Sequence, residues 1–216
     1  MGNLVEFSNI KKGYGIHKMI FNNLNLCLES GKIIGLLGPN GSGKTTMIKM
    51  LAGLLRPEEG TITVDGKTIG HESKAVVSYL PERTYFNESL KIRQLVDMFK
   101  DFYEDFDETR AYHMMELLKI DPNMVIKKLS KGNKEKVQLI MVMSRRAKLY
   151  LLDEPIAGVD PAARDYIIET ILTNYDQEAT ILISTHLIYD IENILDEVIF
   201  LKEGNIVCHR NTDELI

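Results

Sequence analysis

Gly38-Pro39-Asn40-Gly41-Ser42-Gly43-Lys44-Thr45-Thr46 is the stretch of sequence that decides the fold of this chain. It follows the apolar run 32–37, whose composition predicts a buried strand, and it precedes residues 47–52, whose composition suits a helix. The order strand, glycine-rich loop, helix is the context that the pattern GxxxxGK[ST] requires. Glycines in such a loop let backbone N–H groups turn inward and form a concave anion site at a helix N-terminus.

Two side chains of this stretch add chemistry to the loop. Lys44 supplies a mobile cation for the β- and γ-phosphates of a nucleotide, and the Thr45 hydroxyl can ligate Mg²⁺. The stretch therefore predicts that the chain binds a nucleoside triphosphate, ATP or GTP, together with Mg²⁺. The residues expected to contact the nucleotide are Gly38, Pro39, Asn40, Gly41, Ser42, Gly43, Lys44, Thr45 and Thr46.

Size and composition exclude several classes of protein. A length of 216 residues suits one large domain, and the net charge of −5 argues against a nucleic-acid partner. No apolar stretch approaches the roughly 18 residues that span a bilayer, and the N-terminus has no secretory signal pattern. Cys27 and Cys208 lie far apart and outside any CxxC motif, so we expect two reduced thiols. These features predict a cytosolic protein.

The remaining sequence divides into segments of different character. Residues 4–7 and 24–29 alternate apolar and polar positions, and residues 61–67 form a third strand pattern that ends in an Asp-Gly turn. Residues 88–145 have helical patterns, whereas buried-type strands return at 149–152 and 180–184, separated by a helix at 162–172. Residues 197–208 resemble a closing hairpin. Continuous apolar strands that alternate with helices predict a parallel sheet covered on both faces.

The pattern predicts an α/β fold: a mostly parallel core, an antiparallel β part near the N-terminus and an inserted helical part. In the helical part, Leu95, Phe99, Phe102, Tyr103 and Phe106 fall at helical spacing, and we expect this stripe to form its core rather than a partner surface. The antiparallel part is expected at about residues 1–30 and 60–80, the core at about 31–59 and 146–216, and the helical subdomain at about 84–145.

Acidic residues and a histidine follow the two later core strands. Asp153 and Glu154 end the strand at 149–152, and His186 ends the strand at 180–184. Ligands collect at the carboxyl ends of parallel strands, so Asp153 should reach the phosphate loop and hold Mg²⁺ there. Glu154 can then polarise the attacking water as a general base. His186 is placed to contact the γ-phosphate or orient the water, although a lone histidine is usually a structural hydrogen-bonding group.

Taken together, these residues resemble the nucleotide-binding subunits of ATP-binding cassette (ABC) transporters over nearly the whole chain. The most discriminating segment is Leu129-Ser130-Lys131-Gly132-Asn133, which is similar to the family's LSGGQ signature. The resemblance implies a RecA-like P-loop NTPase core and two subunits that close around ATP. In that arrangement Ser130 and Gly132 bind the γ-phosphate of the ATP held by the other subunit.

Further positions match the family, and three depart from it. Tyr14 resembles the aromatic residue that stacks on adenine, Asp160 the acidic member of the D-loop, and His186 the switch histidine. Glu82 stands where the family usually has a glutamine that reaches Mg²⁺ and the water; it can still ligate Mg²⁺ but adds negative charge. Lys131 and Asn133 replace glycine and glutamine in the signature.

The resemblance implies an ATPase that powers transport, most similar to bacterial exporters, through separate integral membrane permease subunits. These partners would dock around residues 83–106, and the chain would pair with itself or a related subunit at the cytoplasmic face of the membrane. The expected catalytic residues are Lys44, Glu154 and His186, with ATP and Mg²⁺ as cofactors. Alternatives are a soluble ABC-type ATPase in translation or DNA maintenance, and a weakly hydrolysing nucleotide-gated module.

Overall fold

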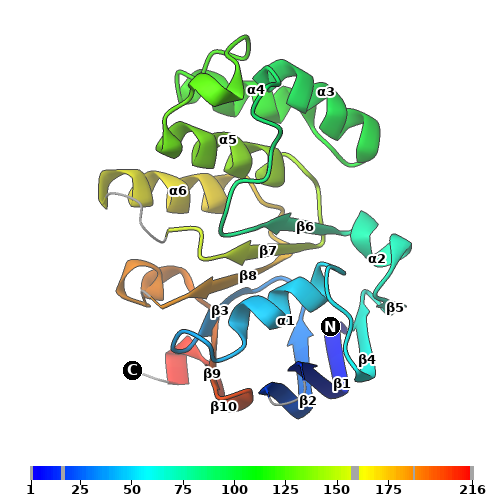
Figure 1. The fold of residues 1–216 in the computed structure, drawn as a ribbon. Coiled ribbons are helices and arrows are strands. Elements are labelled where there is room, and N and C mark those ends of the chain that lie inside the picture. Colours follow the sequence, from blue (N-terminus) through cyan, green and yellow to red (C-terminus); the bar gives the residue numbers. More distant parts are fainter. Residues whose placement is uncertain (1, 16–17, 157–160, 187, 215–216) are drawn as a thin grey trace.

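The computed structural model describes residues 2–15, 18–156, 161–186 and 188–214. The chain forms two β-sheets and a layer of helices, which Figure 1 shows stacked on one another. The helical part α3–α5 lies at one end, the six-stranded sheet in the middle and the strands β1, β2 and β4 at the other end. None of the helices within the described ranges is long and apolar enough to cross a lipid bilayer.

The N-terminal sheet is antiparallel, with the strand order β2-β1-β4-β5. Val5 and Phe7 of β1 are buried on either side of the exposed Glu6, and β2 is buried at every second position from Leu24 to Leu28, which confirms the alternation seen in the sequence. The predicted Asp-Gly turn joins β4 to β5, with left-handed φ angles of 53° at Asp65 and 71° at Gly66. The strands are β1 (Asn3–Tyr14), β2 (Lys18–Glu29), β4 (Glu59–Val64) and β5 (Lys67–Thr68).

The core sheet has the strand order β10-β9-β3-β8-β7-β6. Its neighbours pair in parallel from β9 to β6, and the predicted closing hairpin adds β10 antiparallel at one edge. One boundary was wrong: β6 pairs with β7 in this sheet, although the sequence pattern placed residues 60–80 in the antiparallel part. The strands are β3 (Ile33–Leu37), β6 (Val77–Leu80), β7 (Leu149–Asp153), β8 (Thr180–Thr185), β9 (Glu197–Lys202) and β10 (Asn205–Asn211).

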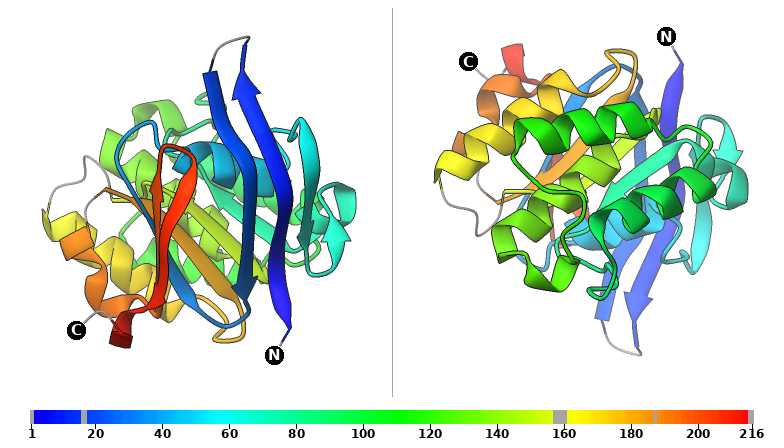
Figure 2. Two further views of the ribbon diagram at one scale, coloured as in Figure 1. Left: turned by 90° about the horizontal axis from the view of Figure 1, so that it is seen from below. Right: turned by 90° about the horizontal axis from the view of Figure 1, so that it is seen from above.

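Each face of the core sheet packs against a different partner. Tyr150 and Leu152 of β7 face the cluster formed with α3–α6, whereas Leu149 and Leu151 face the cluster formed with α1 and the antiparallel sheet. Successive side chains of a strand point to opposite faces, so a continuous apolar strand serves both cores. The views in Figure 2 show helices α3–α6 on one face of the sheet, and the N-terminal strands with α1 on the other. The helices are α1 (Lys44–Leu51), α2 (His71–Ala75), α3 (Ile92–Phe102), α4 (Glu108–Leu117), α5 (Lys131–Met143) and α6 (Pro161–Thr173).

The aromatic stripe of the helical part is only partly buried. Phe99 packs against Tyr103 and Phe106, with ring centroids 5.5 and 5.6 Å apart, as the spacing predicts. Phe102, however, is 76% exposed, so its assignment to the core was wrong. The helix ends at this residue and Tyr103 takes an extended conformation, so helical spacing no longer determines the face beyond it.

A buried arginine joins the helical part to the core sheet. The Arg145 side chain, 3% exposed, donates two hydrogen bonds to the Asp105 carboxylate at 2.9 and 3.0 Å. It also donates to the carbonyls of Val77 at 2.5 Å and Ala75 at 2.7 Å, and its guanidinium lies 3.9 Å from the centre of the Tyr103 ring. A charge that is buried in this way is stabilised only when its donors are satisfied, so Arg145 fixes the position of Asp105 relative to β6.

Candidate nucleotide site

The phosphate loop joins β3 to α1 at the carboxyl edge of the core sheet, as the sequence predicts. Lys44 opens α1 and is 6% exposed. Its ammonium donates to the carbonyl of Gly38 at 2.7 Å and to that of Pro39 at 3.4 Å, and it lies 3.8 Å from Glu154 Oε1. The cation is therefore held inside the loop by backbone oxygens and one carboxylate, in position for an anionic ligand.

The loop backbone is fixed by the turn between β9 and β10. Gly204 N donates to the carbonyl of Ser42 at 3.1 Å. Gly38 approaches β9 so closely that a Cβ atom there would lie 2.1 Å from the Leu201 carbonyl oxygen, which only glycine allows. The Ser42 hydroxyl is buried and has no hydrogen-bond partner among the described residues. A buried hydroxyl of this kind in an N–H-rich loop fits a bound phosphate oxygen.

Thr45 and Asp153 meet where β7 ends beside α1. The Thr45 hydroxyl donates to Asp153 Oδ1 at 3.2 Å, and the Ser184 hydroxyl donates to the same oxygen at 2.7 Å. Burial raises the pKa of the Asp153 carboxyl; these two hydrogen bonds oppose the rise and the nearby Glu82 adds to it. The other oxygen, Oδ2, is buried without a partner among the described residues.

This corner fits a magnesium ion. A buried carboxylate oxygen with no donor, next to a hydroxyl, is the kind of oxygen ligand that Mg²⁺ takes. In the described part of the chain no group of three or more histidine, cysteine, aspartate or glutamate side chains could enclose a metal by itself. The remaining ligands would therefore be phosphate oxygens and water, as is usual for Mg²⁺ with nucleotides.

Glu154 and His186 form the next part of the site. Glu154 has a left-handed φ of 51°, and its N–H donates to the Ser184 carbonyl at 3.1 Å and hydroxyl at 3.0 Å. Its carboxylate lies between two groups: Oε2 is 2.9 Å from His186 Nδ1, and Oε1 faces Lys44. A non-glycine residue with positive φ is strained, and such strain at a functional position is maintained by the surrounding hydrogen bonds.

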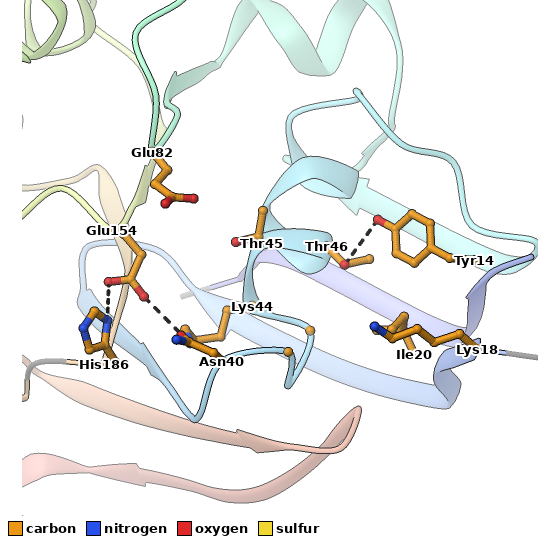
Figure 3. Close-up of a pocket in the computed structure, with 12 residues that line it drawn as sticks. Tyr14, Lys18, Ile20, Asn40, Lys44, Thr45, Thr46, Glu82, Glu154 and His186 are labelled. Carbon is orange, nitrogen blue, oxygen red and sulfur yellow. Dashed lines mark hydrogen bonds and ion pairs between the residues drawn. The ribbon is translucent and has the colours of Figure 1, made fainter. Parts of the chain in front are cut away.

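Lys44, Thr45, Glu154 and His186 line one cavity of about 400 Å³, which Figure 3 shows in close-up. Of the predicted phosphate-loop and metal residues, four are not among its lining residues: Gly38, Pro39, Ser42 and Asp153. Glu154, His186 and Lys44 lie toward one side of the cavity and Tyr14 toward the other, with the Tyr14 hydroxyl 3.4 Å from Thr46 Oγ1. Predictions from separate parts of the sequence thus come together in one place. The lining residues are Tyr14, Lys18, Ile20, Asn40, Gly41, Gly43, Lys44, Thr45, Thr46, Glu82, Glu154 and His186.

Two lining residues, Lys18 and Ile20, were missed by the sequence analysis. They lie on β2, and Lys18 pairs with Tyr14 across the β1–β2 hairpin. The register of that hairpin has several shifts, so the sequence pattern alone does not identify the residue opposite Tyr14. The only signal in the sequence was Tyr14 itself, which indicated that residues of the neighbouring strand could also line the nucleotide site.

Other candidate residues lie outside the cavity. Ser130 caps α5, where its hydroxyl accepts a hydrogen bond from Asn133 N at 3.2 Å, and both it and Gly132 are exposed. Neither lines the cavity in the described chain. The Ser130 hydroxyl is thus a helix cap, and the fold of one chain does not bring these two residues to the phosphate loop. Asp160 and its neighbours 157–159 lie outside the described residues.

Comparisons with known proteins agree with this geometry. The sequence family described as "ABC transporter" matches residues 21–157. The chain is 31% identical over 215 residues to the ABC transporter ATP-binding protein YtrB of Bacillus subtilis (strain 168), covering 98% of this chain and 73% of that protein. It is 30% identical to Nod factor export ATP-binding protein I of Burkholderia orbicola (strain AU 1054), covering 98% and 72%.

A comparison with solved structures gives the same family. A structure described as the ATP binding subunit of an ABC transporter superposes with a TM-score of 0.88 at 25% identity, over 98% of this chain and 91% of that one. Two further curated relatives are longer, and the chain spans 64% and 60% of their lengths.

Proposed function

The chain belongs to the ABC transporter family as an ATP-binding ATPase subunit, and we propose that it powers export through separate membrane-spanning subunits. The observation that carries this proposal is the arrangement of Lys44, Glu154 and His186 around one cavity. Relatives whose names describe export support the direction of transport. The alternatives in translation or DNA maintenance are not favoured, because the names of the relatives cited here describe a transporter and an export protein.

In this proposal each residue has a distinct task. The loop N–H groups and Lys44 bind the β- and γ-phosphates, and Glu154 accepts a proton from the attacking water. His186 holds Glu154 through the 2.9 Å contact, so the carboxylate keeps its direction toward the γ-phosphate. Mg²⁺, held by Thr45 and Asp153, would neutralise phosphate charge when bound. Glu82 is a further candidate ligand because it lines the same cavity.

Glu82 also keeps a second candidate open, a nucleotide-gated module that hydrolyses slowly. It adds a negative charge to a cavity that already contains Glu154, and it raises the pKa of Asp153. A carboxylate beside the phosphates opposes the charge of the ligand. A measurement of turnover by the wild-type protein separates the two candidates, since the slow module would bind ATP but release little phosphate.

The exposed signature segment supports a two-chain site. Ser130 and Gly132 lie at the N-terminus of α5, where backbone N–H groups and the helix dipole favour an anion. Since they do not line the cavity of their own chain, we propose that they contact ATP held by a second subunit. Asp160 would lie at the same interface. The partner can be a copy of this chain or a related subunit.

The membrane partner would bind a groove of about 470 Å³ between the core and the helical part. Leu54 and Tyr85 line it and are each more than half exposed, and the exposed Arg83 adds charge. An exposed apolar groove with polar edges is typical of a protein-binding surface. Four lining residues fall within the predicted docking segment 83–106: Arg83, Tyr85, Phe99 and Tyr103. With a membrane-spanning partner bound in this groove, the chain would lie at the cytoplasmic face of the membrane.

Substitutions of two charged site residues test the ATPase proposal. We expect Glu154→Gln to lower kcat by about 10²–10⁴-fold, because the general base is lost, while ATP binding is retained and a dimer accumulates. Lys44→Ala should bind ATP poorly. The measurements are phosphate release, equilibrium binding of ATP, and light scattering after size exclusion.

Each result has a defined meaning. Hydrolysis by Glu154→Gln at the wild-type rate would show that Glu154 is not the base. His186→Ala should also lower turnover, and an unchanged rate would leave His186 a structural role only. In the Glu154→Gln background, Ser130→Arg should abolish the ATP-dependent dimer without weakening ATP binding by the monomer. Persistence of that dimer would contradict the two-chain site.

A further inference from the structure

Lys18 is a cation at the nucleotide cavity to which no motif assigns a role. It opens β2 and lies directly opposite Tyr14 in the β1–β2 pairing. Opposed residues of an antiparallel pair place their side chains on the same face of the sheet, with Cβ atoms about 4.5–5.5 Å apart. Both residues line the cavity, and Ile20, two positions along β2, lines it as well. The hairpin therefore brings an aromatic ring and an ammonium group to the same wall.

The Lys18 ammonium makes no ion pair or hydrogen bond within the described part of the chain, in contrast to Lys11, which is 2.9 Å from Glu59. The other lysine of the cavity, Lys44, is already held by the Gly38 carbonyl and faces Glu154. Two carboxylates, Glu82 and Glu154, also line the cavity. Among the charged groups of the cavity, the unpaired Lys18 ammonium should therefore contribute most to the binding of a polyanionic ligand.

The order of groups along the cavity assigns a target to this cation. In Figure 3, Glu154 and His186 lie at one side, Thr45 and Lys44 in the middle, and Thr46, Tyr14 and Lys18 at the other. If the γ-phosphate lies at Glu154 and the base at Tyr14, the first phosphate after the ribose lies between Thr46 and Lys18. Ile20 closes this end, with its Cγ2 3.2 Å from where a Cβ on Gly43 would stand.

We propose that Lys18 binds the α-phosphate of the nucleotide and so sets the affinity for both ATP and ADP. The inference rests on the proposed function, since it takes the direction of the nucleotide from Glu154 and Tyr14. The α-phosphate keeps its charge during cleavage of the γ-phosphate. Lys18 therefore binds the ground state and the transition state equally, and such uniform binding changes KM and not kcat.

The test uses Lys18→Ala, Lys18→Arg and the control Lys67→Ala. Lys67 lies exposed on β5, does not line the cavity, and its loss changes the net charge by the same amount. Titration calorimetry with ATP and with ADP should show a roughly tenfold rise in Kd for Lys18→Ala with either nucleotide, on the scale of one partly exposed charge-assisted hydrogen bond. Lys18→Arg should keep most of the affinity, and Lys67→Ala should match the wild type.

The outcomes separate this inference from the proposed function. A wild-type chain that binds neither nucleotide would overturn the proposed function itself. A wild type that binds both, with Lys18→Ala binding as tightly, would overturn only the assignment of Lys18. A loss confined to ATP would place Lys18 on the γ-phosphate, and a loss with ATP and ADP but not with AMP would place it on the β-phosphate; either result would contradict the assignment. Steady-state kinetics gives the independent readout: KM for ATP should rise about tenfold in Lys18→Ala, and a fall in kcat of the same size would contradict uniform binding.

Discussion

Replacement of Gly204 by alanine should loosen the phosphate loop from a distance. Gly204 lies in the turn between β9 and β10, has a φ of 75°, and donates its N–H to the Ser42 carbonyl at 3.1 Å. A Cβ atom at this position would lie 1.6 Å from the carbonyl oxygen of Ile20, so the turn must move away from β2. Because the same turn holds Ser42, its movement displaces the phosphate loop.

Three contributions determine how much stability Gly204→Ala should lose. A non-glycine residue in the left-handed region costs about 1–2 kcal/mol. Loss of the Gly204 N–H bond to Ser42 adds about 1 kcal/mol, and forcing a methyl group into a packed site adds about 1–3 kcal/mol. We therefore expect Gly204→Ala to lower the free energy of unfolding by about 3–6 kcal/mol and to weaken ATP binding.

Gly66→Ala is the matched control because it carries the backbone strain without the steric overlap. Gly66 has a φ of 71°, but a Cβ atom there would meet nothing within 4 Å. We expect it to cost about 1–2 kcal/mol and to leave the Kd for ATP unchanged. Urea denaturation and ATP titration of both variants measure the difference. If the two variants lost equal stability, or if Gly204→Ala bound ATP as the wild type does, the turn would not hold the loop.

Two further predictions concern buried charges. Arg145→Ala should lower the free energy of unfolding by about 3–5 kcal/mol, whereas Arg146→Ala, whose ion pair to Asp107 is exposed, should cost under about 1 kcal/mol; urea denaturation compares them. Asp153→Asn should stabilise the nucleotide-free protein at pH 7. Burial raises the pKa of the Asp153 carboxyl in the folded state, so the free energy of unfolding of the wild type falls as pH rises from 3.8 through the folded pKa. Below pH 3.8 the variant should no longer be more stable than the wild type, and an equal difference in stability at low pH would contradict this explanation.

The positions of most candidate site residues could be predicted because each residue belongs to a local pattern. The phosphate loop, Asp153 and His186 follow buried strands, and the carboxyl ends of parallel strands share one edge. The sequence therefore predicted which residues meet without any knowledge of the distances between them. The 2.9 Å contact from Glu154 to His186 and the 3.2 Å contact from Thr45 to Asp153 agree with that prediction.

Other features depend on pairings that no local pattern records. The place of β6 in the core sheet comes from its pairing with β7, about 70 residues away in sequence, so the strand could not be assigned to a sheet from its composition. Phe102 is the last residue of α3 and keeps the helical spacing of the stripe, yet it is 76% exposed, so spacing alone did not identify it as a surface residue. In the sequence, Arg145 is an ordinary basic residue that follows a helix pattern. Only the tertiary structure brings Asp105 and the carbonyls of Val77 and Ala75 to its guanidinium.

By itself, the sequence predicted the chemistry that we propose for this protein: a phosphate loop, a carboxylate for metal, a carboxylate for water, and a signature segment that acts on a second subunit. These are properties of residue type at fixed spacing, and short-range backbone geometry is enough to express them. The tertiary structure alone decided that Lys18 and Ile20 line the cavity and that Gly204 holds Ser42. Those contacts join segments far apart in the chain, and strand register and packing determine them.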